Sequence, residues 1–210
     1  MSLTAALHRP VLADLIARPA ARPHAAAVDV ALVLAGATLV ALLAKVSFFI
    51  GPVPITGQTL GVIAAGAALG SKRGAAALTT YALAGLAGLP VFAGALAGPA
   101  YALAPSFGFV IGFIPAAFAA GWFAERAWDR KPVLAFGGFA TASVIPFLTG
   151  VPYMALILTT VLGQQVSVAG VLDAGVWPFI VPGLIKAAAA ALAIPGAWLL
   201  VRSADRTKRS

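Results

Sequence analysis

The stretch that decides the fold runs from Gly74 to Ala124 and reads GAAALTTYALAGLAGLPVFAGALAGPAYALAPSFGFVIGFIPAAFAAGWFA, 51 residues without one Asp, Glu, Lys, Arg or His. The hydrocarbon core of a bilayer is about 30 Å thick and takes roughly 20 helical residues to cross, so this stretch is long enough for two crossings. A second uncharged stretch extends over 41 residues from Pro132 to Leu172. The sequence therefore predicts an all-α membrane protein.

The composition excludes a water-soluble domain, because 61% of the 210 residues are hydrophobic, 10% are charged and the mean hydropathy is +1.01. The net charge of +8 comes from 14 basic and 6 acidic residues. These charges gather in short clusters between apolar stretches, so we expect no nucleic-acid partner. Cysteine is absent, and both histidines, His8 and His24, precede the first apolar stretch, so we expect no metal site.

The positions of the basic residues predict the number of crossings, because Lys and Arg are retained on the cytoplasmic side of short loops. Four clusters, before residue 24, at 72–73, at 126–131 and beyond 201, hold 12 of the 14 basic residues. If all four clusters are cytoplasmic, an even number of crossings separates each neighbouring pair, and two fit into each interval. We expect six transmembrane helices with both termini cytoplasmic, at 26–45, 57–70, 74–92, 105–127, 132–163 and 176–202. They form one membrane domain, 25–202, between a disordered cytoplasmic tail, 1–24, and a basic cytoplasmic tail, 203–210.

The segment from Gly51 to Thr59, GPVPITGQT, interrupts this regularity with two prolines and two glycines. Irregular backbone at membrane depth survives only against protein or a wet cavity, so the segment is either a cavity wall or an ordinary exposed loop. The segment carries three neutral side chains that can hydrogen-bond, Thr56, Gln58 and Thr59. They either form hydrogen bonds with an amide-like ligand or cap the following helix. A second irregular segment, 88–99, is either a lid or a connecting turn.

Lys186 lies inside the last predicted helix, away from both of its ends. An uncompensated lysine there costs about 2.5–3.5 kcal/mol on insertion scales, and such residues usually mark a substrate or ion path. The one carboxylate predicted on the outer side is Asp173. Either Asp173 folds in to meet Lys186, or the ammonium is held for the carboxylate of a ligand, or the side chain snorkels to the interface.

Two further patterns leave alternatives open. Aromatic residues near the outer helix ends, among them Phe92 and Tyr153, form an interfacial belt or line a pocket. Ala27, Ala31 and Ala35 recur at four-residue spacing and either pack inside the bundle or let a partner helix approach closely. No phosphate-binding loop and no arrangement of nucleophile and base is present, so we expect neither an enzyme nor a bound cofactor.

Four ordered runs carry a family resemblance: Val53 to Val62, Gly70 to Gly74, Gly85 to Gly94, and 108–113 leading to 124–126. Together they resemble the BioY family, the biotin-specific S components of energy-coupling-factor transporters, over roughly residues 28 to 200. The resemblance implies an S-component-like six-helix bundle in the bacterial plasma membrane that binds biotin from outside. It also implies partners, a transmembrane coupling protein and cytoplasmic ATPase subunits, with the seam of Ala27, Ala31 and Ala35 contacting the coupling protein.

The resemblance further implies roles for single residues. Lys186 matches the family's last-helix lysine, but the acidic residue that family members commonly carry three positions earlier is Gly183 here. We expect Lys186 to pair with the valerate carboxylate of biotin, and the other expected ligand-binding residues are Gln58, Thr56, Phe92, Tyr153 and Asp173. The sequence-based hypothesis is thus a biotin-binding S component of a vitamin importer. The alternative is a structural or assembly subunit of a membrane complex that binds no ligand.

Overall fold

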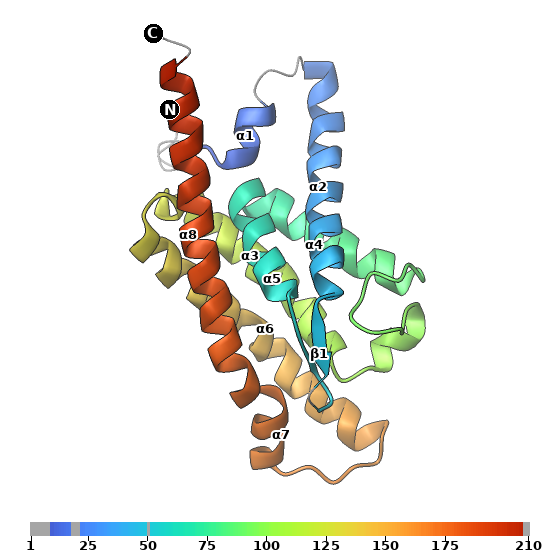
Figure 1. Ribbon diagram of the computed structural model, residues 1–210. Helices are drawn as coiled ribbons and strands as arrows, with labels where there is room; N and C mark the ends of the chain where they lie inside the picture. Colours follow the sequence, from blue (N-terminus) through green and yellow to red (C-terminus); the bar gives the residue numbers. More distant parts are fainter. Residues whose placement is uncertain (1–8, 18–21, 50, 208–210) are drawn as a thin grey trace, which may run out of the picture.

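The computed structural model describes residues 9–17, 22–49 and 51–207, and almost all of its ordered elements are helices (Figure 1). In chain order these are α1 Leu12–Ala17, α2 Arg22–Ala44, β1 Ser47–Phe49, β2 Pro54–Thr56, α3 Gln58–Leu69, α4 Ser71–Leu86, η1 Pro99–Leu103, α5 Phe107–Ala124, η2 Trp128–Arg130, α6 Pro132–Thr160, α7 Val168–Gly175 and α8 Trp177–Thr207. In Figure 1, α1 and the end of α8 lie at the top and α7 lies at the bottom. We call these the α1 end and the hairpin end of the molecule, the latter after the antiparallel hairpin that β1 and β2 form.

Within the described residues, four helical stretches are long and apolar enough to cross a membrane: Ala25–Ala44, Phe107–Ala124, Pro132–Thr160 and Val168–Val201. The predicted helices at 57–70 and 74–92 form as α3 and α4, with 12 and 16 residues. Both are shorter than the roughly 20 residues that a perpendicular crossing takes. The all-α membrane class is confirmed, and the six-crossing topology stays a prediction.

The prediction that the third helix reaches residue 92 is wrong, because α4 ends at Leu86. Gly88 adopts a positive φ of 102°, which a helix does not permit, and Pro90 has no N–H to donate. The amide of Gly98 donates to the carbonyl of Gly85 at 2.8 Å and closes the loop against the helix end. Residues 87–98 therefore form a folded loop at the hairpin end.

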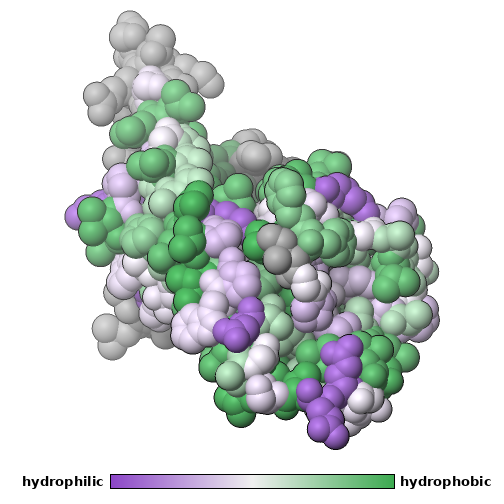
Figure 2. Space-filling view, turned by 60° about the horizontal axis from the view of Figure 1, so that its bottom comes forward, coloured by the Kyte–Doolittle hydropathy of each residue, from purple (hydrophilic) through white to green (hydrophobic). Residues whose placement is uncertain are grey.

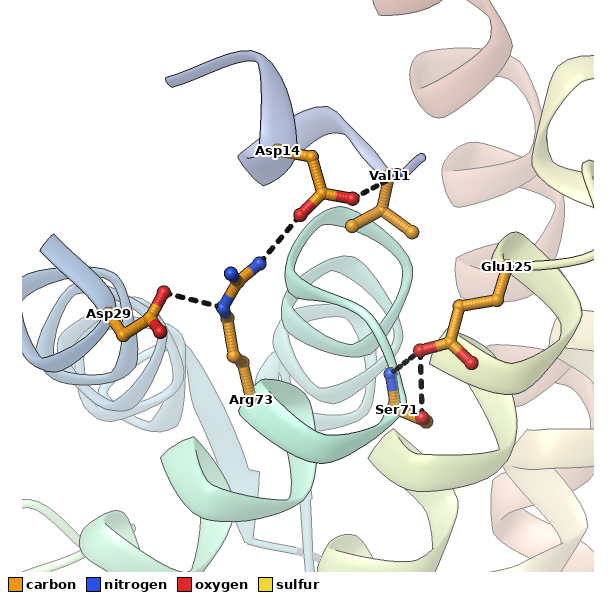
Figure 3. A network of polar contacts seen from close by, with 6 residues as sticks. All are labelled: Val11, Asp14, Asp29, Ser71, Arg73 and Glu125. Atoms are coloured by element: carbon orange, nitrogen blue, oxygen red, sulfur yellow. Dashed lines mark hydrogen bonds and ion pairs between the residues drawn. The ribbon is translucent and has the colours of Figure 1, made fainter. Parts of the chain in front are cut away.

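The predicted disordered tail contains a short helix. Ala13 of α1 and Val11, which precedes the helix, are buried at 3% and 2% exposed. The carboxylate of Asp14 accepts from the amide of Val11 at 2.9 Å and from Arg73 Nη1 at 2.9 Å (Figure 3). Arg73 Nε in turn lies 2.8 Å from Asp29 Oδ1, so one guanidinium on α4 ties α1 to α2. Burial disfavours the charge of Arg73, but the two carboxylates outweigh it and raise the pKa of the guanidinium.

Glu125, at the end of α5, holds the start of α4 to the same end. Its Oε1 accepts from both the amide and the hydroxyl of Ser71, each at 2.7 Å (Figure 3). Its backbone carbonyl also accepts from the amide of Arg9 at 2.7 Å. The N-terminal segment, as far as it lies within the described residues, is thus bonded to two of the central helices.

The turn between α5 and α6 anchors the last helix. Asp129 is fully buried, and its Oδ2 accepts from Trp198 Nε1 of α8 at 2.6 Å. The guanidinium of Arg130 lies 4.3 Å from the centre of the Trp198 ring and donates to the carbonyl of Pro10 at 2.9 Å. These contacts hold α8 at Trp198, and the helix continues to Thr207, past its predicted end at 202.

α5 is the central helix of the bundle. Of the residues in its apolar stretch, 61% are buried inside the protein, compared with 17% in the apolar stretch of α2. α5 packs against α3, α4 and α6. Near the α1 end these helices meet at a glycine seam, which consists of Gly66, Gly74 and Gly121. A Cβ on Gly66 would collide with the carbonyl oxygen of Ala117, and one on Gly121 would collide with the α3–α4 turn. Close packing at this end contrasts with the hairpin end, where the helices separate around a cavity.

Candidate binding site

A two-stranded hairpin leads the chain from α2 into α3. β1 and β2 are antiparallel, with Ser47 opposite Thr56 and Phe49 opposite Pro54. The amide of Gly57 donates to the carbonyl of Val46 at 2.8 Å and closes the base of the hairpin. A Cβ on Gly57 would lie 2.8 Å from the carbonyl oxygen of Leu43, so only glycine permits this close return to α2. The irregular segment predicted as a cavity wall or an exposed loop is therefore a folded hairpin.

A chain of buried hydrogen bonds fixes the start of α3. The hydroxyl of Thr56 donates to Gln58 Oε1 at 2.8 Å, and Gln58 Nε2 donates to the hydroxyl of Tyr81 at 2.6 Å. The Tyr81 hydroxyl donates onward to the carbonyl of Val91 at 3.2 Å. This series of hydrogen bonds joins β2, α3, α4 and the 87–98 loop. Both the oxygen and the nitrogen of the Gln58 side-chain amide are hydrogen-bonded within it.

Lys186 projects from α8 to this corner. Its Nζ donates to the carbonyl oxygen of Thr56 at 2.6 Å. Over the ranges that the structure describes, no carboxylate lies within ion-pair distance of this ammonium. A lysine ammonium has three N–H donors, so Lys186 keeps donors beyond the one that Thr56 accepts.

The ammonium borders a cavity between the hairpin and the helices α3, α5, α6 and α8. Counted with its open mouth, the space between the lining residues measures about 640 Å³. Its wall is mostly apolar, and its lining residues are Val53, Pro54, Thr56, Gln58, Thr59, Tyr101, Ser106, Phe109, Val110, Phe113, Ser143, Pro146, Phe147, Phe179, Gly183 and Lys186. An apolar chamber with a few placed polar groups suits a small organic ligand with one charged end.

Three aromatic rings from three helices form one side of the cavity. Phe109 of α5 stacks on Phe179 of α8, with 6.3 Å between ring centroids, and meets Phe147 of α6 edge-on at 5.7 Å. Gly150 lies against the Phe109 ring and leaves room for it. Sequence reasoning missed Phe109 and Phe147, since a helix that is apolar all round gives no signal for which face borders a cavity.

Of the six residues predicted to bind the ligand, Thr56, Gln58 and Lys186 share the wall of this cavity. The other three, Phe92, Tyr153 and Asp173, lie outside that wall. The contacts that each of these three residues makes instead are as follows.

Phe92 is fully buried behind the cavity. Its ring stacks on Tyr101, a lining residue, at 4.0 Å between centroids, and its carbonyl accepts from Lys45 Nζ at 2.9 Å. Tyr153 donates its hydroxyl to the carbonyl of Ala102, which directs it to η1. Asp173 is exposed on α7 and does not pair with Lys186, so the expected alternative of an Asp173–Lys186 pair is not formed.

A surface hollow adjoins the cavity at the hairpin end. It is lined by the hairpin and the 93–96 segment, and it shares Pro54, Tyr101 and Ser106 with the cavity wall. Burial raises the pKa of Tyr101, whose hydroxyl pairs with Ser106 Oγ at 3.1 Å, so the phenol stays neutral at physiological pH. Figure 2 shows this end of the molecule, where hydrophilic residues form separate patches on a widely hydrophobic surface.

The BioY family model matches residues 17–203. The chain belongs to the BioY family. The probable biotin transporter BioY of Pyrococcus horikoshii is 36% identical over 164 residues, which cover 78% of this chain and 92% of that relative. The biotin transporter BioY of Rhizobium etli is 37% identical over 158 residues, covering 72% and 81%. The family predicted from the four sequence runs is confirmed. The predicted location, a multi-pass protein of the plasma membrane, is confirmed as well. The relatives are transporters rather than enzymes, as predicted.

The BioY fold is also found in a solved structure, the S-component for biotin from an ECF-type ABC transporter. That chain is 23% identical and superposes with a TM-score of 0.59 over 80% of this chain and 89% of that chain. The likeness establishes a common fold.

The predicted contact surface for the coupling protein, which consists of Ala27, Ala31 and Ala35, lies on the outside of α2. All three are exposed on α2, whereas Ala37 and Val40 of the same helix are buried against the bundle. Small exposed side chains would let another helix approach α2 closely.

Proposed function

We propose that the chain is the biotin-binding S component of an ECF-type vitamin importer. The observation that carries the proposal is the Lys186 ammonium at the edge of an apolar, aromatic-walled cavity, where its partner is a neutral carbonyl. Biotin combines one carboxylate with an apolar valerate chain and a fused ring system. Lys186 pairs with the carboxylate, and the three phenylalanine rings hold the apolar part.

The proposed topology has six crossings with both termini cytoplasmic, and the contacts at the α1 end support it. Arg73 bonds to α1, and Arg130 bonds to the N-terminal segment and stacks on α8. Three of the four basic clusters therefore gather at one end of the molecule, as retention of Lys and Arg on one side of the membrane requires. Biotin then enters from the opposite, outer side.

The short helices α3 and α4 fit this topology because folded segments extend them. The hairpin precedes α3 and the 87–98 loop follows α4, and both lie at the hairpin end. Their buried hydrogen bonds satisfy the backbone within protein, which the membrane interior demands of irregular segments.

Delivery of biotin needs partners in this proposal. The 210 residues contain no phosphate-binding loop that would bind ATP, so energy comes from cytoplasmic ATPase subunits through a transmembrane coupling protein. The exposed stripe of Ala27, Ala31 and Ala35 on α2 is the proposed contact with the coupling protein. No cofactor is required, since biotin is the transported ligand.

The test is thermal stabilisation of the purified chain in detergent. A ligand that binds only the folded state stabilises it by about 2.7 kcal/mol at a concentration of 100 times Kd. Biotin should raise the melting temperature in a concentration-dependent way, whereas valerate, which has the carboxylate but lacks the rings, should act only at far higher concentration. A structural or assembly subunit would show no shift with either compound, and that result would refute the proposal.

A further inference from the structure

Thr59 lines the cavity from the first turn of α3, and its hydroxyl is buried without a hydrogen-bond partner. It is the one hydroxyl of which this holds among the residues that the structure describes. Buried polar groups in native proteins are almost always paired, so an orphaned hydroxyl that borders a cavity calls for a partner from a ligand.

Three other helical threonines show the usual local alternative. Thr79, Thr141 and Thr160 each donate to the carbonyl four residues earlier, at 2.9, 2.8 and 2.7 Å. Thr59 lacks this choice because the residue four positions earlier is Ile55, which belongs to β2 and pairs with Phe48 across the hairpin. The hairpin therefore removes the usual local acceptor.

The remaining polar groups of the wall are already engaged. The amide of Gln58 is bonded to Thr56 and Tyr81, and the hydroxyl of Ser143 donates to a carbonyl of its own helix at 2.8 Å. The hydroxyls of Tyr101 and Ser106 pair with each other. Thr59 thus differs from the other hydroxyls of the wall in having no hydrogen-bond partner.

We propose that the Thr59 hydroxyl donates a hydrogen bond to the same carboxylate that Lys186 pairs with. Lys186 Nζ lies 2.6 Å from the carbonyl of Thr56, three residues before Thr59, so the ammonium and the hydroxyl border one short segment of wall. A carboxylate has about four acceptor positions, more than one ammonium occupies, and it accepts hydroxyl donors readily. The inference rests on the proposed function, and it predicts that Lys186 and Thr59 together make the cavity bind an acid more tightly than its neutral derivatives.

The test compares Thr59→Val, which keeps the shape and loses the hydroxyl, with Thr59→Ser, which keeps the hydroxyl. Thr79→Val is the matched control, because it removes a threonine hydroxyl that is bonded within its helix and does not line the cavity. Binding of biotin and of biotinamide, its uncharged analogue, is measured by titration calorimetry in detergent. The melting temperature of each ligand-free variant is measured alongside.

Thr59→Val should weaken biotin binding about tenfold to a hundredfold, the usual worth of a hydrogen bond to a charged group, and should change biotinamide binding by less than about threefold. Its ligand-free melting temperature should stay the same or rise, because the hydroxyl it loses is unpaired. Thr59→Ser should retain most of the affinity, and Thr79→Val all of it.

Three results would overturn the inference: unchanged biotin affinity in Thr59→Val, equal losses for biotin and biotinamide, or a lowered ligand-free melting temperature without a loss of affinity. Equal losses for biotin and biotinamide would show that Thr59 contacts the ring system of biotin rather than its carboxylate. A lowered melting temperature without a loss of affinity would show that the hydroxyl stabilises the fold rather than the ligand. If the unsubstituted chain itself binds no biotin, the proposed function fails and this inference fails with it. Binding by the unsubstituted chain together with any of the three results overturns the inference alone.

Discussion

Replacing Lys186 with Met tests the central contact of the cavity. Met keeps an unbranched apolar side chain but removes the ammonium that lies 2.6 Å from the Thr56 carbonyl. Loss of one partner of a buried, hydrogen-bonded charge pair costs about 2–5 kcal/mol of binding free energy. At about 1.4 kcal/mol for each factor of ten, Kd for biotin should rise between about 30-fold and several thousand-fold.

The same substitution should leave the ligand-free bundle folded. Removing the ammonium relieves the insertion cost of a lysine, about 2.5–3.5 kcal/mol, and loses a hydrogen bond from a charged group, worth about 1.5–3 kcal/mol. These two contributions nearly cancel. Binding is measured by titration calorimetry in detergent and folding by thermal unfolding without ligand.

Lys45→Met is the matched control for this experiment. Lys45 also donates to a backbone carbonyl, that of Phe92 at 2.9 Å, but it does not line the cavity. Its loss should change Kd far less than the loss of Lys186. Unchanged biotin affinity in Lys186→Met, or equal losses in both variants, would refute the assignment of Lys186 to the carboxylate.

Three further changes test other parts of the molecule. Ala31→Leu with Ala35→Leu should spare biotin binding and impair assembly, because bulky side chains block a close helix approach; intact co-purification with the coupling protein would contradict the seam. Gln58→Leu leaves buried hydroxyls without their partners and should lower the free energy of unfolding by about 1–3 kcal/mol, which thermal unfolding measures; an unchanged melting temperature would count against the network. Asp14→Ala removes both the α1 cap and the contact with Arg73, so amide hydrogen exchange of residues 9–17 should accelerate while biotin affinity stays constant, and unaltered exchange would speak against the anchor.

The polar part of the site was predictable from the sequence because its residues break the apolar pattern. A lysine within a membrane helix and a Thr-x-Gln segment after two prolines stand out, and the structure brings Lys186, Thr56 and Gln58 to one wall. The apolar part was not predictable in the same way. Phe92 and Phe109 are both aromatic residues near helix ends or loops, yet one is packed behind the wall and the other forms it.

The fold was predictable where charge clusters bracket long apolar stretches, so α2, α5, α6 and α8 lie close to their expected ranges. Tertiary contacts decided the rest. α1 forms because Asp14 caps it and Arg73, 59 positions away in sequence, holds Asp14. The hairpin likewise depends on the amide of Gly57 finding the carbonyl of Val46 at the end of α2.

Gly183 offers a steric opening one helical turn before Lys186. A Cβ at this position would have no heavy atom within 4 Å, so alanine fits there without displacing a neighbour. Gly183 itself lines the cavity.

The glycine seam has a mechanical consequence. Where Gly66, Gly74 and Gly121 meet, backbones touch without side chains between them, and so closely packed an interface has a low compressibility. We therefore expect any opening that admits a ligand to occur in the hairpin and the 87–98 loop, while the half of the molecule around the glycine seam stays stiff. A partner that grips the stiff half would move the whole body as one piece, so cargo exchange and docking would be mechanically separate events.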